Sequence, residues 1–489
     1  MSDDESAPDA PPPRSRSVTG RAAHGALWST ASYGAGQVLR LGSNLILTRL
    51  LFEEAFGVMA LVNVFIIGLH LFSDIGINAS VIQNEKGDQP DFLDTAWTLQ
   101  ILRGLGLFTV ASACALPFAA FYDEPQLAGL IPIAASSALF DGFISTKRYE
   151  AQRNVQMKAL AIQEIVSQTT GIVVMVLLAY IYRSVWALAL GGVVQAAMSV
   201  AMSHFYLPGH SNRLRWHRES VRGVMSIGRW VFLSTSATFF SSYTDRLLLG
   251  KLIPTDLLGV YNIGLSMAGL PRVLVAKLAQ TILFPVMSRV FHDERGELKE
   301  AFHRTRLPIL IFSGWCLAGF IAGGQVIIDL LYDDRYIEAG WVVQVISIAT
   351  WFTTLELAAE FFLLAQGRPQ VNVVASYAHL AAMLVLIPLG HDVGGFFGAV
   401  VGYGSTELVR YLVFAIALQR AQLARFWMDG AMTLALLASA LVVHLVERQA
   451  FEADWGLLPR VLVVFFLTTG LWSPGLVWMT RRFRRGRSA

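Results

Sequence analysis

Apolar runs recur at short intervals along almost all of this 489-residue chain. A helix of about 20 apolar residues crosses the roughly 30 Å hydrocarbon core of a bilayer. Inside lipid, only helices and closed barrels satisfy every backbone hydrogen-bonding group, and these runs do not alternate as strands do. Charged residues make up only 15% of the chain, against about 25% in soluble proteins. The sequence therefore predicts an all-α integral membrane protein.

We count about fourteen membrane-spanning helices. The predicted spans are residues 26–50, 56–82, 95–121, 126–146, 159–181, 185–207, 224–250, 257–288, 307–331, 339–365, 371–389, 395–419, 427–446 and 457–479. Residues 1–20 are polar, acidic and proline-rich without the apolar core of a signal peptide, so we expect a disordered, uncleaved tail. Cys114 and Cys316 both fall inside predicted spans, which implies no disulfide framework.

Lysine and arginine concentrate in alternate loops. One set of loops contains the segment Arg213–Arg222 and the C-terminal run RRFRRGR. The other set carries few basic residues and several acidic pairs, such as Asp333 and Asp334. Because cytoplasmic loops of membrane proteins collect Lys and Arg, we expect an even number of spans and both termini in the cytoplasm. The expected location is the cytoplasmic (inner) membrane.

Two short patterns occur twice in the same order. RLLFEEAFGV at 49–58 is similar to KLIPTDLLGV at 251–260, and FYDEPQL at 121–127 is similar to LYDDRYI at 331–337. Each copy falls between two predicted spans, in a loop on the outer side. One such match could arise by chance, but two in matching order favour a duplication. We therefore predict two six-helix lobes that form a parallel repeat around a central cavity.

This repeat sets the predicted domains. They are a tail at 1–20, an N-terminal lobe at 21–207, a basic linker at 208–223, a C-terminal lobe at 224–421, and two additional helices with a basic tail at 422–489.

Several charged side chains fall inside the predicted spans. A charge near the bilayer centre costs at least about 2.5–3.5 kcal/mol, so such a residue faces a bundle interior or a watery cavity. The candidates that lie in the first hairpin of each lobe are Arg40, His70, Arg246, Arg272 and Lys277. Arginine matches phosphate oxygens and stays charged at any relevant pH. We therefore predict a cavity that binds an anionic head group.

The alternative is that these cations are neutralised within the protein. The acidic residues available for this are Asp74, Asp245, Glu356, Glu360 and Glu407. Glu407 and Arg410 are three positions apart on one predicted helix, which favours an ion pair. Asp74 and Asp245 have a second predicted role, because an acid in a cavity that titrates with access to both sides can carry H⁺ or hold Na⁺.

Other features concern packing and excluded chemistry. Pro271 precedes Arg272 directly and is expected to interrupt its helix. The pairs Gly319/Gly323 and Gly398/Gly402 have the spacing of close helix contacts. The chain has no phosphate-binding loop and no Cys/His metal spacing, and its predicted outer loops are short. We expect no enzyme activity, no resident cofactor, no metal and no nucleic-acid partner.

The segments around the repeated turns carry a family resemblance. RLLFEEAFGVMALVNVF with LFSDIGINASVIQ, and DRLLLGKLIPTDLLGVYNIGLSMAGLP with LFPVMSR, resemble the polysaccharide transport (oligosaccharide flippase) family of the MOP exporter superfamily. The resemblance covers about residues 20–420. The second turn keeps Pro254 of the family's pattern, whereas Phe52 stands where proline is common in the first.

The resemblance implies two lobes around a V-shaped cavity lined by predicted spans 1, 2, 7 and 8. It also implies alternating access, driven by an H⁺ or Na⁺ gradient, that moves an undecaprenyl-diphosphate-linked oligosaccharide to the outer leaflet. By position, Arg40, His70, Arg246, Arg272 and Lys277 would be its cavity cations. The two additional spans resemble those that form a groove for the lipid tail in lipid II flippases.

We therefore expect a flippase or exporter of surface polysaccharide units such as lipopolysaccharide or exopolysaccharide. Its expected partners are the lipid-linked oligosaccharide, membrane lipids, and a polysaccharide polymerase with its co-polymerase. One alternative is an antiporter of small cationic compounds of the MATE type, which would need an acidic cavity. Another is a non-transporting membrane component of polysaccharide assembly.

Overall fold

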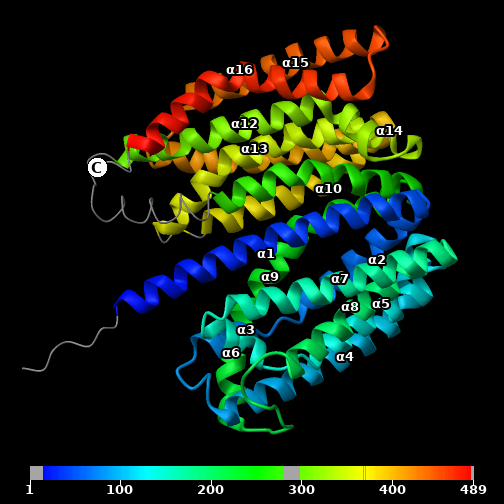
Figure 1. Cartoon of the computed structure of the whole chain (residues 1–489), viewed down its shortest axis with the longest axis vertical. Helices are drawn as coiled ribbons and strands as arrows, with labels where there is room; N and C mark the ends of the chain where they lie inside the picture. The colour runs from blue at the N-terminus through cyan, green and yellow to red at the C-terminus, as the bar shows by residue number, and fades with distance from the viewer. Residues whose placement is uncertain (1–14, 279–297, 367, 369, 486–489) are drawn as a thin grey trace, which may run out of the picture. The chain divides into compact units, whose positions relative to one another are not determined.

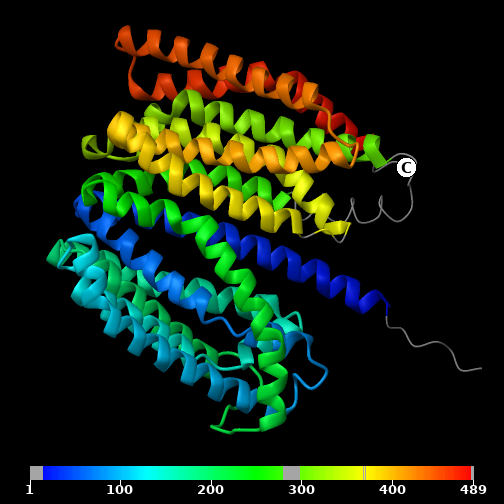
Figure 2. The ribbon, with the colours of Figure 1, turned by 180° about the vertical axis from the view of Figure 1, so that it is seen from behind.

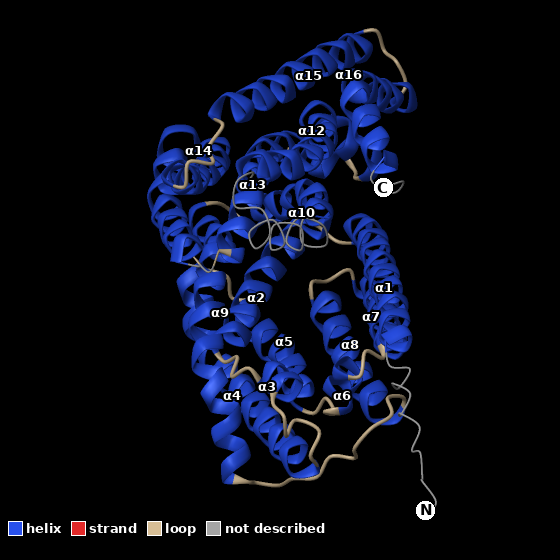
Figure 3. Cartoon of the chain, turned by 90° about the vertical axis from the view of Figure 1, so that its left-hand side faces the viewer, coloured by secondary structure: helices blue, strands red, loops and turns tan. Residues whose placement is uncertain are grey.

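The computed structural model describes residues 15–278, 298–366, 368 and 370–485. These residues form helices joined by short loops, and they contain no strand (Figure 3). The helices, labelled in Figure 1, are α1 (Ser15–Leu50), α2 (Glu53–Phe72), α3 (Ile77–Gln83), α4 (Pro90–Tyr122), α5 (Leu127–Gly142), α6 (Lys147–Arg153), α7 (Met157–Tyr182), α8 (Trp186–Phe205), α9 (Arg218–Leu252), α10 (Thr255–Leu278), α12 (Leu298–Leu331), the 3₁₀ turn η2 (Asp334–Tyr336), α13 (Ala339–Ala365), α14 (Gln370–Arg420), α15 (Phe426–Glu452) and α16 (Leu457–Arg485). The all-α prediction is confirmed.

The protein is a multi-pass membrane protein. Ten of the described helices are long and apolar enough to cross a bilayer, or eleven if the bent pair α5–α6 forms one span. The predicted number of spans, fourteen, stays a prediction. Residues 15–20 of the predicted disordered tail belong to α1, so helix formation begins earlier than the polar sequence indicated. The predicted span 257–288 extends beyond the described residues after position 278.

Contacts within the chain define two compact units. Unit 1 takes its described residues from Met1–Ile46, Phe72–Pro117 and Ala128–Phe232, and unit 2 takes its described residues from Leu47–Leu71, Phe118–Leu127 and Leu233–Ala489. The boundaries fall inside α1, α4 and α9, before the last residue of α2 and after the first residue of α5. The domain boundaries expected from the sequence stay predictions.

Unit 1 is organised around the paired helices α7 and α8, with α6 packed against both. A separate core of buried apolar side chains joins α3, α4 and the first turns of α9. Val81, Leu93 and Val224 are fully buried in it. Burial of these side chains fixes the start of α9 to the helices of this unit.

Unit 2 contains the longer helices. α13 packs against α10, α12 and α14, and α15 and α16 pack against each other and against α12. Figures 1 and 2 show this pair in orange and red along one side of the unit. Trp351 and Phe362 of α13 are buried in two apolar clusters, which also include residues of α12 and α14.

Small residues allow close helix contacts in unit 2, as the sequence predicted for two pairs. A Cβ atom at Gly323 would lie 2.8 Å from Val464 of α16, whereas one at Gly319 would meet nothing within 4 Å. A Cβ atom at Gly398 would lie 1.9 Å from the Gly390 carbonyl oxygen. The first prediction is thus confirmed for Gly323 alone, and Gly398 packs against the preceding part of α14.

Candidate functional site

The five predicted cavity cations lie on four helices: Arg40 on α1, His70 on α2, Arg246 on α9, and Arg272 and Lys277 on α10. The Lys277 side chain lies outside the described part of the chain. Arg40 belongs to unit 1, and His70, Arg246 and Arg272 belong to unit 2. Their binding role stays a prediction.

The two predicted coupling acids have different surroundings. Asp74 lies in the turn between α2 and α3, where its Oδ1 accepts a hydrogen bond from the Gly76 backbone N–H at 2.9 Å. Gly76 adopts a left-handed conformation with φ 66°, so the Asp74 carboxylate stabilises this turn. Asp245, in contrast, lies inside α9 and is only 1% exposed. Coupling through either acid stays a prediction.

Asp245 is the centre of a buried polar cluster in unit 2. Its Oδ2 accepts a hydrogen bond from the Tyr261 hydroxyl at 2.6 Å, and its Oδ1 lies 3.5 Å from Nη1 of Arg246. Arg246 also donates to the Ser242 carbonyl oxygen at 3.0 Å. Oδ1 accepts no hydrogen bond from a described residue. The adjacent arginine thus offsets the buried charge, but one carboxylate oxygen is available for a ligand.

Tyr403 of α14 lies beside the Asp245 cluster. Its ring centroid is 6.2 Å from that of Tyr261, the residue that donates to Asp245. A small cavity of ≈ 30 Å³ lies beside Tyr403, which is room for a water molecule or two. The cavity is lined by Leu265, Gly269, Arg272, Ile346, Ala349, Thr350, Tyr403 and Glu407. The structure thus brings together three of the predicted site residues, Asp245, Arg246 and Arg272.

Carboxylates of α13 neutralise Arg410. Nη1 of Arg410 lies 3.0 Å from Glu356 Oε1, and Nη2 lies 3.7 Å from Glu360 Oε2. Arg410 therefore pairs with α13 and not with Glu407, the partner predicted from sequence spacing. The physical reason is that α13 packs against α14 and places its acids beside the guanidinium.

A histidine links Glu407 to the rest of the cluster. Oε1 of Glu407 lies 3.7 Å from Nε2 of His379, and the same ring nitrogen lies 2.9 Å from the Thr406 hydroxyl. The other ring nitrogen, Nδ1, lies 3.4 Å from the Ser241 hydroxyl of α9. His379 is 2% exposed. This chain of polar contacts joins α9 to both parts of α14.

The cluster can hold a proton or a small cation. Within the cluster, four buried carboxylate oxygens accept no hydrogen bond from a described residue: Asp245 Oδ1, Glu356 Oε1, Glu356 Oε2 and Glu407 Oε2. The first two lie beside Arg246 and Arg410, whereas Glu356 Oε2 and Glu407 Oε2 have no cation of a described residue within 4 Å. A buried acid oxygen without a partner is costly when ionised, which favours a bound cation or proton. Glu356 and Glu407 were considered in the sequence only as neutralising partners, and His379 and Tyr403 were missed. The sequence signal that could have indicated a site role for Glu356 and Glu407 is the presence of acidic residues within apolar spans.

The repeated turns contact each other in unit 2. α1 ends at Leu50 and α2 begins at Glu53, and in the second copy α9 ends at Leu252 and α10 begins at Thr255. A Cβ atom at Gly57 would lie 1.7 Å from the Thr255 carbonyl oxygen. A Cβ atom at Gly259, the aligned residue, would lie 2.1 Å from the Glu53 carbonyl oxygen. Each glycine thus packs on the other copy's first turn.

The second pair of repeated segments makes exchanged contacts as well. In the first copy, the Tyr122 hydroxyl donates to the Leu247 carbonyl oxygen at 3.1 Å, and Lys251 Nζ lies 2.7 Å from Asp123 Oδ2. In the second copy, Arg335 donates to the carbonyl oxygens of Thr48 and Leu51, at 2.7 Å and 3.0 Å. Each loop therefore caps the end of the other copy's first helix. We call these contacts, with those of Gly57 and Gly259, the clasp.

The clasp contains charged groups outside the apolar spans. A hydrogen bond to Asp333 raises the pKa of Arg335, which holds the guanidinium charged over the α1 carbonyl groups. Burial raises the pKa of Glu124, and the like charge of Glu54 acts in the same direction.

The family model and the similar proteins described below all carry names from polysaccharide biosynthesis. A family model described as polysaccharide biosynthesis protein matches residues 46–340, more than half of the chain. The teichuronic acid biosynthesis protein TuaB of Bacillus subtilis is 22% identical over 302 residues, which cover 60% of this chain and 61% of TuaB. The succinoglycan biosynthesis transport protein ExoT of Rhizobium meliloti is 22% identical over 303 residues, 60% of each chain.

Solved structures show the same fold. The lipid II flippase MurJ in an inward closed conformation has a TM-score of 0.68 at 13% identity, and the match covers 95% of this chain and all of that one (100%). An inward-facing multidrug MATE transporter of the MOP superfamily has a TM-score of 0.62 at 10% identity, with coverage of 82% and 96%. The chain therefore shares the fold of these two proteins.

Proposed function

Because the chain belongs to the family described as polysaccharide biosynthesis protein, we propose that it moves polysaccharide units, attached to a lipid diphosphate, across the cytoplasmic membrane. The names of the relatives support a role in making or transporting surface polysaccharide. The fold it shares with a flippase and a multidrug transporter supports translocation over an enzymatic step. The proposed cargo is an undecaprenyl-diphosphate-linked oligosaccharide, and both termini are proposed to face the cytoplasm.

The observation that carries this proposal is the contrast between paired and unpaired arginines. Arg246 and Arg410 each lie within 4 Å of a carboxylate of the cluster. Arg40 and Arg272 are exposed, and neither has an ion pair with any residue that the structure describes. Because a permanent charge in a membrane helix needs a partner, each of these guanidinium groups by itself suits a ligand that carries phosphate.

We propose that an ion gradient drives the cycle through the buried cluster. Asp245 and the unsatisfied oxygens of Glu356 and Glu407 would take up H⁺ or Na⁺. The lining of the small cavity includes both Glu407 and Arg272, so the charge state of the acids would act on the proposed phosphate-binding arginine at short range. In this mechanism the clasp is the closed gate on one side.

The test uses cells that lack this protein and accumulate lipid-linked oligosaccharide on the inner leaflet. Arg40→Ala and Arg272→Ala should each fail to restore export at normal protein level. Loss of one charge-assisted contact, about 1.5–3 kcal/mol, should lower export by roughly 10- to 100-fold. Arg272→Lys, which keeps the charge without the planar fork, should retain more export than Arg272→Ala.

Arg448→Ala is the matched control. Arg448 is an arginine of α15 that pairs with Glu452 at the surface, with a side chain 68% exposed, and its loss should leave export unchanged. Full export by both Arg40→Ala and Arg272→Ala would remove the phosphate-binding assignment. An absence of trapped glycolipid in the deletion strain would argue against the flippase proposal as a whole.

The buried carboxylates fit a second candidate, an antiporter of small organic cations. The observation in its favour is the number of acids in the cluster, since Asp245, Glu356 and Glu407 are all less than 4% exposed. Proteoliposomes with an imposed pH gradient separate the two candidates. Uptake of a cationic dye that is lost in Asp245→Asn would support the antiporter, whereas no dye uptake would support the polysaccharide proposal.

A further inference from the structure

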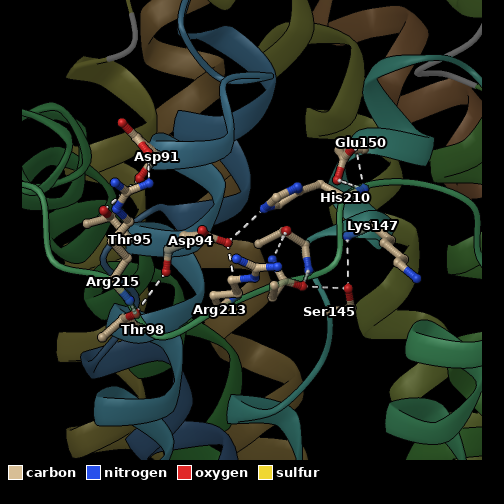
Figure 4. A network of polar contacts seen from close by, with 12 residues as sticks. Asp91, Asp94, Thr95, Thr98, Ser145, Lys147, Glu150, His210, Arg213 and Arg215 are labelled. Carbon is tan, nitrogen blue, oxygen red and sulfur yellow. Dashed lines mark hydrogen bonds and ion pairs between the residues drawn. The ribbon is translucent and has the colours of Figure 1, made fainter.

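The basic linker between α8 and α9 is fixed to unit 1 by its own backbone. Three N–H groups at alternate positions donate to side chains of α4. Arg213 donates to Asp94 at 2.9 Å and Arg215 donates to Thr98 at 3.0 Å (Figure 4). His217 donates to Thr95 at 3.2 Å. These three backbone hydrogen bonds fix residues 213–217 to α4.

Additional contacts hold the preceding part of the linker. Nε2 of His210 lies 2.9 Å from Asp94 Oδ1, and the His210 backbone N–H donates to the Glu150 carboxylate at 3.2 Å. The Asn212 side-chain oxygen accepts hydrogen bonds from the Ser145 hydroxyl at 2.6 Å and from the Thr146 backbone N–H at 3.0 Å. The linker is thus a fixed surface element of this unit and not a loose tether.

The side chains of this fixed segment are left uncovered within the chain. Leu214 and Trp216 are 71% and 56% exposed. The side chains of Arg213, Arg218 and Arg222 are exposed as well, and none of them has an ion pair with a described residue. We call these five residues the linker face. Large apolar side chains and unpaired cations thus lie on one short segment. Exposure to water is favourable for the cations but unfavourable for the apolar side chains.

The position of the linker face indicates which medium covers it. It begins shortly after α8, an apolar helix long enough to cross a bilayer that ends at Phe205. Phe205 itself is 92% exposed and Tyr206 is 42% exposed. Aromatic residues at the ends of spans sit at the level of the lipid head groups. The linker face therefore continues an aromatic border at the membrane surface.

We propose that the linker face lies in the head-group layer and binds anionic phospholipids. The indole and isobutyl groups of Trp216 and Leu214 would enter the boundary between head groups and acyl chains. The three unpaired guanidinium groups would contact lipid phosphates. This site is separate from the proposed cargo site, since it shares no residue with that site and concerns the surrounding bilayer.

Depth measurements on spin-labelled full-length protein test the proposal. Leu214→Cys and Trp216→Cys are made in a Cys114→Ser/Cys316→Ser background, labelled, and reconstituted in vesicles of phosphatidylglycerol and phosphatidylethanolamine. We expect both labels to collide more with oxygen and less with a water-soluble nickel reagent than a label at Asp88→Cys. Asp88 is the matched control, because it is exposed in the α3–α4 loop without an apolar neighbour in sequence.

The anionic requirement is tested by lipid composition and charge. The shift in label depth should shrink in phosphatidylcholine vesicles, and it should also shrink in anionic vesicles when Arg213→Gln, Arg218→Gln and Arg222→Gln are combined. The proposal would be overturned if, in both lipids, the nickel reagent reached the labels at 214 and 216 as readily as the label at Asp88→Cys. Protection that occurs only in native membranes would also overturn it, because it would indicate a protein partner. No cargo is present, so either outcome is independent of the proposed transport.

Discussion

Some buried charges in this protein are matched by partners from other helices. Arg306 of α12 is 1% exposed, and its guanidinium lies 2.6 Å from Asp429 Oδ1 and 2.6 Å from the Leu355 carbonyl oxygen. The Tyr411 hydroxyl donates to the second oxygen of Asp429 at 2.8 Å. Both terminal nitrogens of the arginine and both acid oxygens therefore have partners, whereas Nε of Arg306 has none among the described residues. Such partners are the condition for an ion pair in an apolar interior.

Removal of one member of this pair should be costly. Arg306→Ala leaves Asp429 buried without its cation, and we expect a loss of about 3–5 kcal/mol in the free energy of unfolding. Arg448→Ala, which breaks the exposed pair with Glu452, should cost about 0–1 kcal/mol. Thermal unfolding of both variants in the same detergent provides the measurement. Equal unfolding temperatures for the two variants would contradict the expected role of burial.

At the scale of elements, glycine and proline act differently from one helix to the next. Pro271 was predicted to interrupt its helix, but α10 runs from Thr255 to Leu278 with this proline inside. The break occurs instead in α14, where Gly394 and Gly395 leave the helical conformation. Gly395 has φ 57° and ψ −139°, a combination that is essentially restricted to glycine. One glycine thus separates the two parts of α14.

Substitution of the two adjacent glycines tests this assignment. Gly395→Ala should lower the stability by about 1–3 kcal/mol because a Cβ atom is strained at this φ and ψ. Gly394→Ala should be tolerated, since its φ of −140° is open to any residue and a Cβ atom there meets nothing within 4 Å. Fluorescence-detected unfolding in detergent compares them. If Gly395→Ala were as stable as Gly394→Ala, the assignment of Gly395 as the residue that requires glycine at the break would be wrong.

At the scale of the whole molecule, the internal repeat is visible as a reciprocal contact. Gly57 packs on the Thr255 carbonyl, and its repeat equivalent Gly259 packs on the Glu53 carbonyl. Residue pairs that exchange roles in this way are typical of a two-fold axis. The first turns of the two hairpins therefore meet in the clasp.

Added bulk at the contact between Gly57 and Gly259 should make the clasp more accessible to a water-soluble reagent. Gly57→Ala and Gly259→Ala insert methyl groups where no space exists, at about 1–3 kcal/mol each, so the open population should rise roughly 5- to 150-fold for each change. The reporter is Leu258→Cys, at a residue that is 0% exposed, in a protein without native cysteines. Its labelling by a membrane-impermeant thiol reagent should speed up.

Gly430→Ala is the control for this experiment. A Cβ atom at Gly430 meets nothing within 4 Å, and the change should leave the labelling rate at Leu258→Cys unaltered. Unchanged labelling in both Gly57→Ala and Gly259→Ala would show that the clasp does not open in the membrane.

The sequence by itself determined the fold class, because long apolar runs can satisfy their backbone groups in lipid only as helices. It also determined the equivalence of the two hairpins, since aligned residues occupy equal places at Leu50–Glu53 and Leu252–Thr255. Only the tertiary structure decided which charges meet. Arg410 pairs across to Glu356 while Glu407 lies beside His379, since burial selects partners by the packing of neighbouring helices and not by their separation along the chain.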